Sequence, residues 1–556
     1  MDISTIPLLS IIVFLPLVGA FAVGFGPASA ARPVALTFAL LAWVASLLLL
    51  VGYLPGRQGF QYVEVAQWIP FFGIQYKLGA DGLSVALVVL TTTLSWISIL
   101  ASFKPIQTRI KEYMVSFLVL EVGMIGVFVA LDTFLFYIFW EIVLVPMYLI
   151  IGIWGGANRI YATIKFVLYT LVGSLLMLVA ILATAYAYQA GHDGSWVGAF
   201  DFEVLRTYAA TGGFSDGLQL AAFLAFFLAF AIKVPMFPFH TWLPDAHTEA
   251  PTAGSVILAA IMLKLGAYGL IRFAVPLFPS AAQTFAPAII VLSLIAIIYG
   301  AIVALVQPDL KRLVAYSSVS HMGFVTLGIF VFTEQGLQGA VLQMVNHGLI
   351  TGALFLLVGV FYERTHDRTI AKMGGLAAGM PVWAAVFGFF VFASGGLPGL
   401  SGFVGEFLVL VGTFAANPYA AAVATVVMIL AAAYLLFMFQ RIVFGELSDF
   451  LAGLGDHLTD IEPVEILTLA PLGALVVIFG IQPGLVLNLF SSTVTETLNA
   501  VRPAPAIAIP NEVLLAVIGL IVAGIVARTG WAILRPGPRA SGGTAVTAQP
   551  GTGAAR

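Results

Sequence analysis

The side chains best able to do chemistry in this sequence are ionisable groups that lie inside long apolar runs. An ionisable side chain at the centre of a bilayer costs several kcal/mol, so each one found there is a candidate functional group. A row of such groups can pass protons if each one changes its protonation near neutral pH and senses its neighbours. The candidates for this proton path are Glu141, Lys233, Lys264, His321, His347 and Glu406.

Glu141 and Lys233 are predicted to form a switchable pair. The pKa of a lysine in water is near 10.4, so it must fall by about 3 units before the group titrates near neutral pH. Burial lowers the pKa of a lysine, and a nearby carboxylate opposes that effect. A pair that opens and closes would act as a two-state proton switch. Lys264 and the two His would pass protons laterally, and Glu406 would gate the far exit.

These groups also have a structural interpretation. A buried Glu–Lys pair can hold two helices together, and a pair of His can ligate haem. Five or more ionisable groups on separate predicted spans favour the proton path. Glu121, Asp132 and His240 are less specific candidates for the same path.

The sequence predicts neither a metal site nor a nucleotide cofactor on this chain. His240 and His247 are seven residues apart, and no tight HxxxH pair accompanies them. A capped helix start at Thr252 is the favoured interpretation of that segment. No GxGxxG or GKS/T loop occurs. Cysteine is absent, which excludes disulfides, thiolate-ligated iron–sulfur clusters and thiol nucleophiles.

The composition requires a lipid environment for these candidates. Of 556 residues, 61% are hydrophobic and 9% charged, whereas soluble domains carry about 25% charged residues. A helix needs about 20 apolar residues to cross the bilayer. The sequence predicts an all-α polytopic membrane protein of about 14–15 transmembrane helices, over 7–25, 34–54, 82–102, 114–131, 133–154, 166–189, 218–244, 253–278, 285–306, 313–332, 337–361, 381–414, 420–444, 466–490 and 513–534.

Two predicted spans are longer than a bilayer requires, and both contain helix breakers. Pro235 and Pro238 interrupt the seventh span, and Gly396 and Pro398 interrupt the twelfth. Each broken helix is the fourth of five, which predicts two inverted five-helix repeats, as in ion transporters. The predicted organisation is three N-terminal spans (1–111), a first repeat (112–279), a second repeat (280–445), spans fourteen and fifteen (446–540), and a disordered tail (541–556).

Lysine and arginine in the loops predict the orientation. With the N-terminus outside, the cytoplasmic loops hold most of the basic residues, Lys311 and Arg364 among them, and Arg272 lies on the opposite side. The C-terminus would then be cytoplasmic if span fifteen crosses. The predicted location is a cell (inner) membrane.

Several motifs resemble those of a known family. Residues 233–252, KVPMFPFHTWLPDAHTEAPT, look like the signature of the antiporter-like membrane subunits, and LGADGLS at 78–84, FWE at 139–141, SSVSHMG at 317–323 and NHG at 346–348 support the resemblance. That family includes membrane subunits of the proton-translocating NADH–quinone oxidoreductase (complex I), Mrp-type antiporter subunits and membrane subunits of energy-converting hydrogenases. Members differ at the position of Glu406, where many have Lys.

The resemblance implies proton translocation driven by quinone reduction in partner subunits. It implies that NADH, FMN, iron–sulfur clusters and quinone are held by those partners. The implied partners are other membrane subunits, especially neighbouring antiporter-like subunits, and the bilayer, with no nucleic acid. It carries the proton path over to Glu141, Lys233, Lys264 and Glu406, with His321 and His347 between them. The alternatives are a Mrp-type Na+/H+ antiporter subunit, a hydrogenase membrane subunit, and a scaffold whose buried charges only hold helices.

Overall fold

A computed structural model of the chain describes residues 6–501, 509–510, 512–514, 516–519 and 523. The prediction of an all-α polytopic membrane protein is confirmed. The described residues contain 13 helices long and apolar enough to cross a membrane, and two shorter apolar helices, Pro381–Ser394 and Ser401–Ala416. Most of the predicted fifteenth span, 513–534, and the predicted tail from 541 lie outside the described residues. Residues up to Ile509 form one compact unit, and Pro510–Arg556 belong to a second.

Eleven helices in the described chain run uninterrupted through the first unit. Helical geometry pairs most backbone groups within each segment, as lipid requires, although α1, α14 and α22 each contain an internal Pro. They are α1 (Leu8–Phe25), α2 (Ala31–Gly52), α3 (Gly82–Ala101), α4 (Ile110–Val129), α7 (Arg159–Ala190), α9 (Asp216–Lys233), α14 (Pro279–Leu305), α15 (Leu310–Phe330), α16 (Glu334–Thr365), α20 (Pro418–Val443) and α22 (Pro463–Ile481).

Three further spans, the fifth, the eighth and the twelfth, are interrupted. The predicted seventh span is also broken, because α9 ends at Lys233 and the chain is helical again only from Trp242. The fifth predicted span divides at Val143 into two helices, and the eighth contains two π-helical segments. Each still crosses as one span, over Thr133–Trp154 and Thr252–Leu277, as the sequence predicted. The local changes of helical geometry inside them were not predicted. The segments are α5 (Thr133–Ile142) and α6 (Leu144–Trp154); α11 (Thr252–Ile257), η4 (Leu258–Met262), α12 (Leu263–Gly269), η5 (Leu270–Ala274) and α13 (Val275–Leu277); and α18 (Pro381–Ser394) and α19 (Ser401–Ala416).

Shorter elements connect these spans. A β-hairpin of β1 (Gln61–Ile69) and β2 (Ile74–Ala80) follows α2, and the predicted fourteenth span ends early and is followed by α23 (Gly484–Ala500). Neither the hairpin nor α23 was predicted. The remaining short helices are η2 (Ala28–Ala30), η3 (Pro70–Phe72), α8 (Phe202–Ala210), α10 (Trp242–Glu249), η6 (Ile370–Lys372), α17 (Leu376–Gly379), α21 (Asp449–Ala452) and η7 (Gly455–His457).

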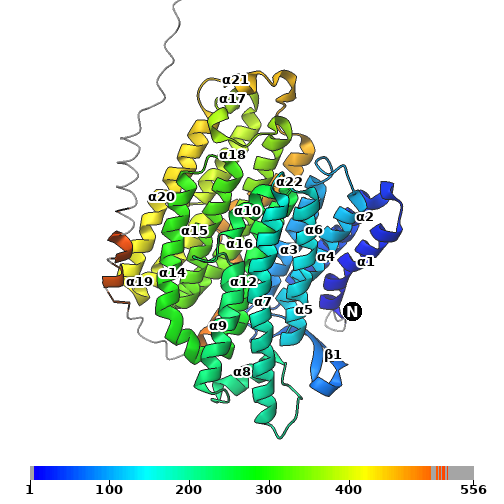
Figure 1. Ribbon diagram of the computed structural model, residues 1–556, viewed down its shortest axis with the longest axis vertical. Helices are drawn as coiled ribbons and strands as arrows, with labels where there is room; N and C mark the ends of the chain where they lie inside the picture. Colours follow the sequence, from blue (N-terminus) through cyan, green and yellow to red (C-terminus); the bar gives the residue numbers. More distant parts are fainter. Residues whose placement is uncertain (1–5, 502–508, 511, 515, 520–522, 524–556) are drawn as a thin grey trace, which may run out of the picture. The chain divides into compact units, whose positions relative to one another are not determined.

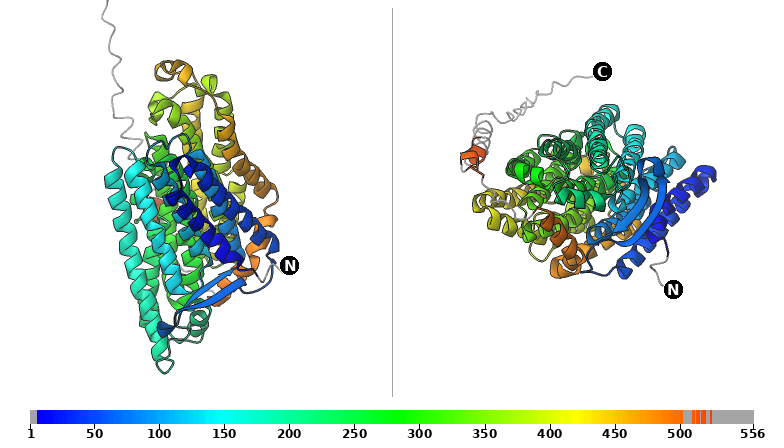
Figure 2. Two further views of the ribbon diagram at one scale, coloured as in Figure 1. Left: turned by 90° about the vertical axis from the view of Figure 1, so that its right-hand side faces the viewer. Right: turned by 90° about the horizontal axis from the view of Figure 1, so that it is seen from below.

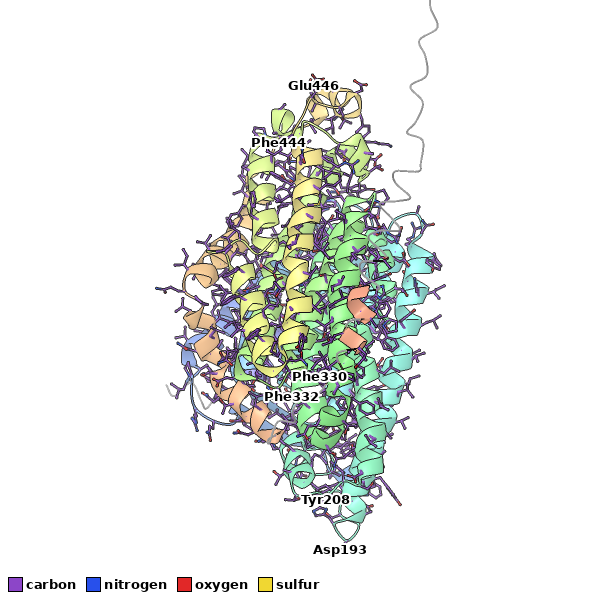
Figure 3. The ribbon with its side chains drawn as sticks, turned by 90° about the vertical axis from the view of Figure 1, so that its left-hand side faces the viewer. Asp193, Tyr208, Phe330, Phe332, Phe444 and Glu446 are labelled. Carbon is purple, nitrogen blue, oxygen red and sulfur yellow. The ribbon has the colours of Figure 1, made fainter. Side chains whose placement is uncertain are left out.

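The connecting elements distinguish the two ends of the helices. Figure 1 shows the hairpin and α8 at one end, and α17 and α21 at the other. Figure 3 places Asp193 and Tyr208 beyond the level of Phe330 and Phe332, so α7 and α8 project past the end of α15. We refer to these as the hairpin end and the α21 end.

The most deeply buried helices are α11–α13 and α16, whose most apolar stretches are wholly enclosed by other helices. In the outer helices α2, α7, α20 and α22 most side chains are exposed or only partly buried, as expected where lipid is the solvent. Figure 2 shows the helices nearly end-on in its right-hand view, with the hairpin beside the N-terminal helices. Ionisable side chains on the central helices are therefore shielded from lipid.

Three basic residues that were placed in loops are buried instead. Lys311 begins the first turns of α15 and donates to the carbonyl oxygen of Ala250. Arg364, near the end of α16, forms a two-pronged pair with Glu465. Arg272 pairs with Asp81, the N-cap of α3. Because these cations are paired with groups inside the protein, they are weaker evidence for the orientation of the chain in the membrane than basic residues in exposed loops.

Candidate functional site

Lys264 and His347 are in direct contact at the centre of the bundle. The Nζ of Lys264 lies 2.6 Å from Nδ1 of His347 and donates at 2.6 Å to the carbonyl oxygen of Ala259. Both side chains are almost completely buried. Ala259 lies in the π-helical segment η4, and a second π segment, η5, follows Lys264. π-helical turns within helices often mark functional positions.

A second pair lies next to the first. Nδ1 of His321 lies 2.6 Å from Oε1 of Glu406, and Gln343 donates to the same oxygen at 3.1 Å. The other ring nitrogen, Nε2 of His321, lies 3.5 Å from the hydroxyls of Ser394 and Tyr434. Glu406 reaches this position because the backbone leaves helical geometry between α18 and α19, and Gly396 supplies a φ of +75° there.

A small cavity separates the two pairs. The ring centroids of His321 and His347 are 5.9 Å apart. The cavity has a volume of about 10 Å³, enough for about one water molecule, and its walls include both His, Gln343, Ser394 and Glu406. Four ionisable groups, Lys264, His347, His321 and Glu406, thus form two hydrogen-bonded pairs, and all of them except Lys264 line this cavity. We call these four residues the central row.

Glu141 and Lys233 lie at two helix ends but do not form an ion pair in the structure. Lys233 is the last residue of α9, and its Nζ lies 5.3 Å from the ring centroid of Trp140 and 5.6 Å from that of Phe166. Cation–π attraction of this kind can hold an ammonium without a carboxylate. Glu141 immediately precedes the junction of α5 and α6, and its Oε1 is buried without a hydrogen-bond partner in the described chain.

The break after Lys233 frees backbone groups near this lysine. Pro235 has no amide hydrogen, and the chain resumes helical geometry only at Trp242, in α10. The indole N–H of Trp242 donates at 2.9 Å to the carbonyl oxygen of Ile232, which satisfies one of the released acceptors. Lys233 is therefore placed at an irregular segment enclosed by protein, where such backbone is tolerated at membrane depth.

Glu121 and His240 are buried but separate from the central row. Both oxygens of Glu121, on α4, lack hydrogen-bond partners within the described residues. Both ring nitrogens of His240 also lack a hydrogen-bond partner among the described residues, and its ring packs against those of Phe237 and Tyr299.

The predicted cap at Thr252 is wrong, because Pro251 occupies the N-cap position of α11 and no side chain caps this helix.

Asp132 caps the start of α5 and also binds the hairpin. Its side chain accepts hydrogen bonds from the backbone amides of Phe134 and Leu135, at the start of α5, and from that of Gln75 in the hairpin. These contacts cap a helix end, where acceptor side chains stabilise the unpaired N–H groups. Asp132 thus ties the hairpin to α5 and makes no contact with the central row in the described structure.

Asp132 also predicts a pH dependence of stability. Burial raises the pKa of Asp132 to about 6. A raised carboxyl pKa favours the neutral form in the folded state, so this group's contribution to stability declines as pH rises from about 4 through about 6. We expect wild type to lose about 1 kcal/mol more than Asp132→Asn between about pH 5 and pH 7, because Asn keeps a capping oxygen but cannot titrate. Thermal unfolding in detergent at both pH values measures this difference. An identical pH dependence would contradict the assignment.

Some polar residues around the central row were not identified from the sequence. Gln343, Ser394, Tyr434 and Ser317 extend the hydrogen-bonded groups, with the Tyr434 and Ser317 hydroxyls 2.7 Å apart. Gln343 could have been found from its spacing, because Gln343 and His347 are four residues apart and therefore lie on one face of a helix. Ser394 and Tyr434 carry no such signal, because they lie on other helices.

Comparison with known proteins adds sequence and structural relatives. Residues 130–431 match the family described as NADH:quinone oxidoreductase/Mrp antiporter, TM. The chain is 51% identical over 502 residues to NADH-quinone oxidoreductase subunit M of Rhodobacter capsulatus, covering 88% of this chain and 96% of the relative. It is 45% identical over 477 residues to NADH-ubiquinone oxidoreductase chain 4 of Chondrus crispus, covering 85% of this chain and 94% of the relative.

Solved structures show the same fold. A chain of respiratory complex I from Thermus thermophilus superposes with a TM-score of 0.79 at 32% identity, covering 89% of this chain and 99% of that chain. A chain of the Mrp complex from Dietzia superposes with a TM-score of 0.75 at 21% identity, covering 92% of this chain and 100% of that chain. The second likeness concerns the fold alone.

Proposed function

Because this chain belongs to the NADH:quinone oxidoreductase/Mrp antiporter transmembrane family, we propose that it acts as the proton-translocating subunit M of an NADH–quinone oxidoreductase. In this role it couples quinone reduction in partner subunits to proton movement across the membrane. The central row carries the proposal, since Lys264 pairs with His347 and His321 with Glu406, each at 2.6 Å, and His347, His321 and Glu406 line one small cavity.

The central row supplies the groups that proton transfer needs. A neutral imidazole accepts a proton at one ring nitrogen and releases one from the other, so His347 and His321 can relay protons between Lys264 and Glu406. The cavity between the rings has room for the single water that would bridge them. Glu141 and Lys233 would serve as the switch at the other end of the path, closing when the segment after α9 moves.

Moving protons against a membrane potential requires an external energy source. Each charge moved costs roughly 2.3 kcal/mol per 100 mV. The chain has no Cys to hold an iron–sulfur cluster. NADH, FMN, the clusters and quinone would accordingly be held by partner subunits, and this chain would receive energy through its contacts with them.

The proposed setting follows from this role. The partners are other membrane subunits of the complex, especially the antiporter-like subunits L and N, in a cell (inner) membrane. We retain the two inverted repeats, 112–279 and 280–445, and an external N-terminus as parts of the proposal. Glu406 favours subunit M over a Mrp-type antiporter subunit, because Mrp relatives typically have Lys at that position.

The test is Lys264→Met in the assembled complex. Met keeps the unbranched apolar stem but cannot carry a proton, so we expect coupled proton pumping to fall at least roughly tenfold, equivalent to about 1.4 kcal/mol of added barrier. Dye-reported acidification of inverted membrane vesicles with NADH measures pumping. The control is Lys372→Met, which removes a lysine that is exposed outside the central row. Equal pumping by both variants would refute the function assigned to the central row.

A further inference from the structure

An apolar cavity lies on the side of α16 that faces away from the central row. It has a volume of about 620 Å³ and lies between α2, α3, α16, α22 and α23. Its walls include Leu90, Val345, Leu349, Leu475, Phe479 and Val486. Val345 and Leu349 flank His347 by two residues on each side, so the cavity walls and the central row share one helix.

A second cavity continues along the same three helices toward the α21 end. It has a volume of about 260 Å³ and is lined by the end of α3, the last turns of α16 and the start of α22. Along α3 and the turn after it the lining advances from Ala86 and Trp96 to Lys104, and on α16 from Val345 to Glu363. On α22 it runs in the opposite chain direction, from Phe479 back to Glu462. The two cavities therefore lie in line along the same three helices, and we call this line the α3–α16–α22 seam.

The polarity of this seam changes with depth. From Ala86 to Trp96 the walls are almost entirely apolar over roughly 15 Å of helix α3, by the helical rise per residue. Trp96 follows, about one and a half turns before the end of α3 at Ala101, and Lys104 lies beyond that end. Along the seam, apolar walls are followed by a single hydrogen-bond donor and then by a charged rim. This order is complementary to the acyl chain, the ester and the headgroup of a phospholipid.

The donor at the intermediate depth has no partner. Trp96 is only 8% exposed, and its indole N–H is buried without a hydrogen bond in the described structure. The neighbouring Trp43 donates at 3.1 Å to Thr93, and the two rings lie 5.8 Å apart. Buried indole N–H groups normally find an acceptor. An ester oxygen at this depth would supply it.

The rim carries an excess of negative charge. Lys104 pairs with Glu462 at 2.6 Å, and Arg364 pairs with Glu465 at 2.8 Å. Glu363, which also lines the seam, forms no ion pair with any described residue. A purely anionic headgroup would be repelled by this carboxylate, whereas a headgroup with both a phosphate and a primary amine can meet Lys104 and Glu363.

From these observations we propose that the α3–α16–α22 seam binds one phosphatidylethanolamine molecule from the leaflet on the α21 side. One acyl chain occupies the apolar cavity behind α16, an ester oxygen accepts from Trp96, the phosphate lies by Lys104, and the amine lies by Glu363. The site is independent of proton transfer by the central row, so either assignment can fail while the other stands.

Photolabelling in vesicles tests the site. The intact complex is reconstituted with phosphatidylethanolamine that carries a diazirine on one acyl chain, and labelled peptides are mapped after illumination. We expect label on the segment with Val345 and Leu349, which are 5% and 1% exposed and accessible to lipid only through the seam. Label on exposed positions of α22, such as Leu467, with none on Val345–Leu349 would overturn the proposal.

Two variants make the result specific to the seam. Ala474→Trp, at an exposed position lining the cavity, should remove most of the label from Val345–Leu349, whereas Ala422→Trp, at an exposed position on α20, should not. Unchanged label in Ala474→Trp would refute the site.

A separate experiment tests the headgroup assignment. The same diazirine chain on phosphatidylglycerol should label wild type less than the phosphatidylethanolamine probe does, and Glu363→Gln should remove that difference. Equal labelling of wild type by both probes would refute the headgroup assignment.

Discussion

Replacing Lys233 with Ala should leave the complex assembled while proton pumping falls at least roughly tenfold, equivalent to about 1.4 kcal/mol of added barrier. The reason is that Lys233 is buried at the end of α9, and its ammonium contacts the faces of Trp140 and Phe166 without an ion pair. The change removes these two cation–π contacts, each worth about 2 kcal/mol, which is too little to unfold the region. Coupled quinone reduction should fall with pumping, because a blocked path holds back the redox step.

Glu141→Ala and Lys233→Met separate this expectation from a scaffold role. A lysine that only fills space tolerates Met, whereas a lysine that carries protons does not. Native gels report assembly, and NADH:quinone reductase and vesicle acidification report coupling. Normal pumping in both Lys233→Ala and Glu141→Ala would reject the switch pair.

Glu406→Gln should also reduce pumping at least roughly tenfold, without loss of assembly. Gln keeps the size of Glu and can still accept hydrogen bonds from His321 and Gln343, which both contact Oε1 of Glu406. It cannot take up or release a proton. The expected loss therefore reports protonation and not packing.

A double variant tests whether Glu406 and His321 act together. If both belong to one path, His321→Gln combined with Glu406→Gln should cost about as much as either alone, because the effects of groups that act as a unit are not additive. Pumping and quinone reduction are measured in all three variants. Glu446→Gln, an exposed carboxylate at the α21 end, is the control (Figure 3). Fully additive losses would place the two side chains on separate paths.

The sequence predicted the spans well because a bilayer imposes a simple length rule on continuous apolar runs. It did not predict the division of the fifth span at Val143. A signal existed, since Pro146 lacks the amide that the carbonyl of Ile142 would bond in a continuous helix. The π-helical segment η4 before Lys264 has no comparable signal, because it contains no Pro or Gly. For η5 a signal existed, since Pro276 lacks the amide that the carbonyl of Arg272 would bond in a regular helix.

Sequence reasoning named the ionisable groups of the path but could not assign their partners. Lys264 was assigned no direct partner, and it contacts His347, 83 residues away. Glu141 and Lys233 were paired by charge alone, and among the described residues they form no ion pair, Lys233 lying instead over the rings of Trp140 and Phe166. Partners across helices depend on how the helices pack, and the local pattern of one helix does not contain that information. The burial of Lys311 escaped notice for the same reason, because its acceptor at Ala250 belongs to another segment.

The β-hairpin limits how this protein can be divided. The region that matches the family begins at residue 130, after the hairpin. Yet hairpin residues satisfy groups inside that region: Gln75 donates to Asp132, and Lys77 pairs with Asp201 and Glu203. Glu64, on the other strand, accepts from the amide of Leu9 in α1. A chimaera that transplanted only residues 130–431 would deprive Asp132 and Asp201 of their hairpin partners Gln75 and Lys77, so an engineered exchange of this core must also carry residues 61–80.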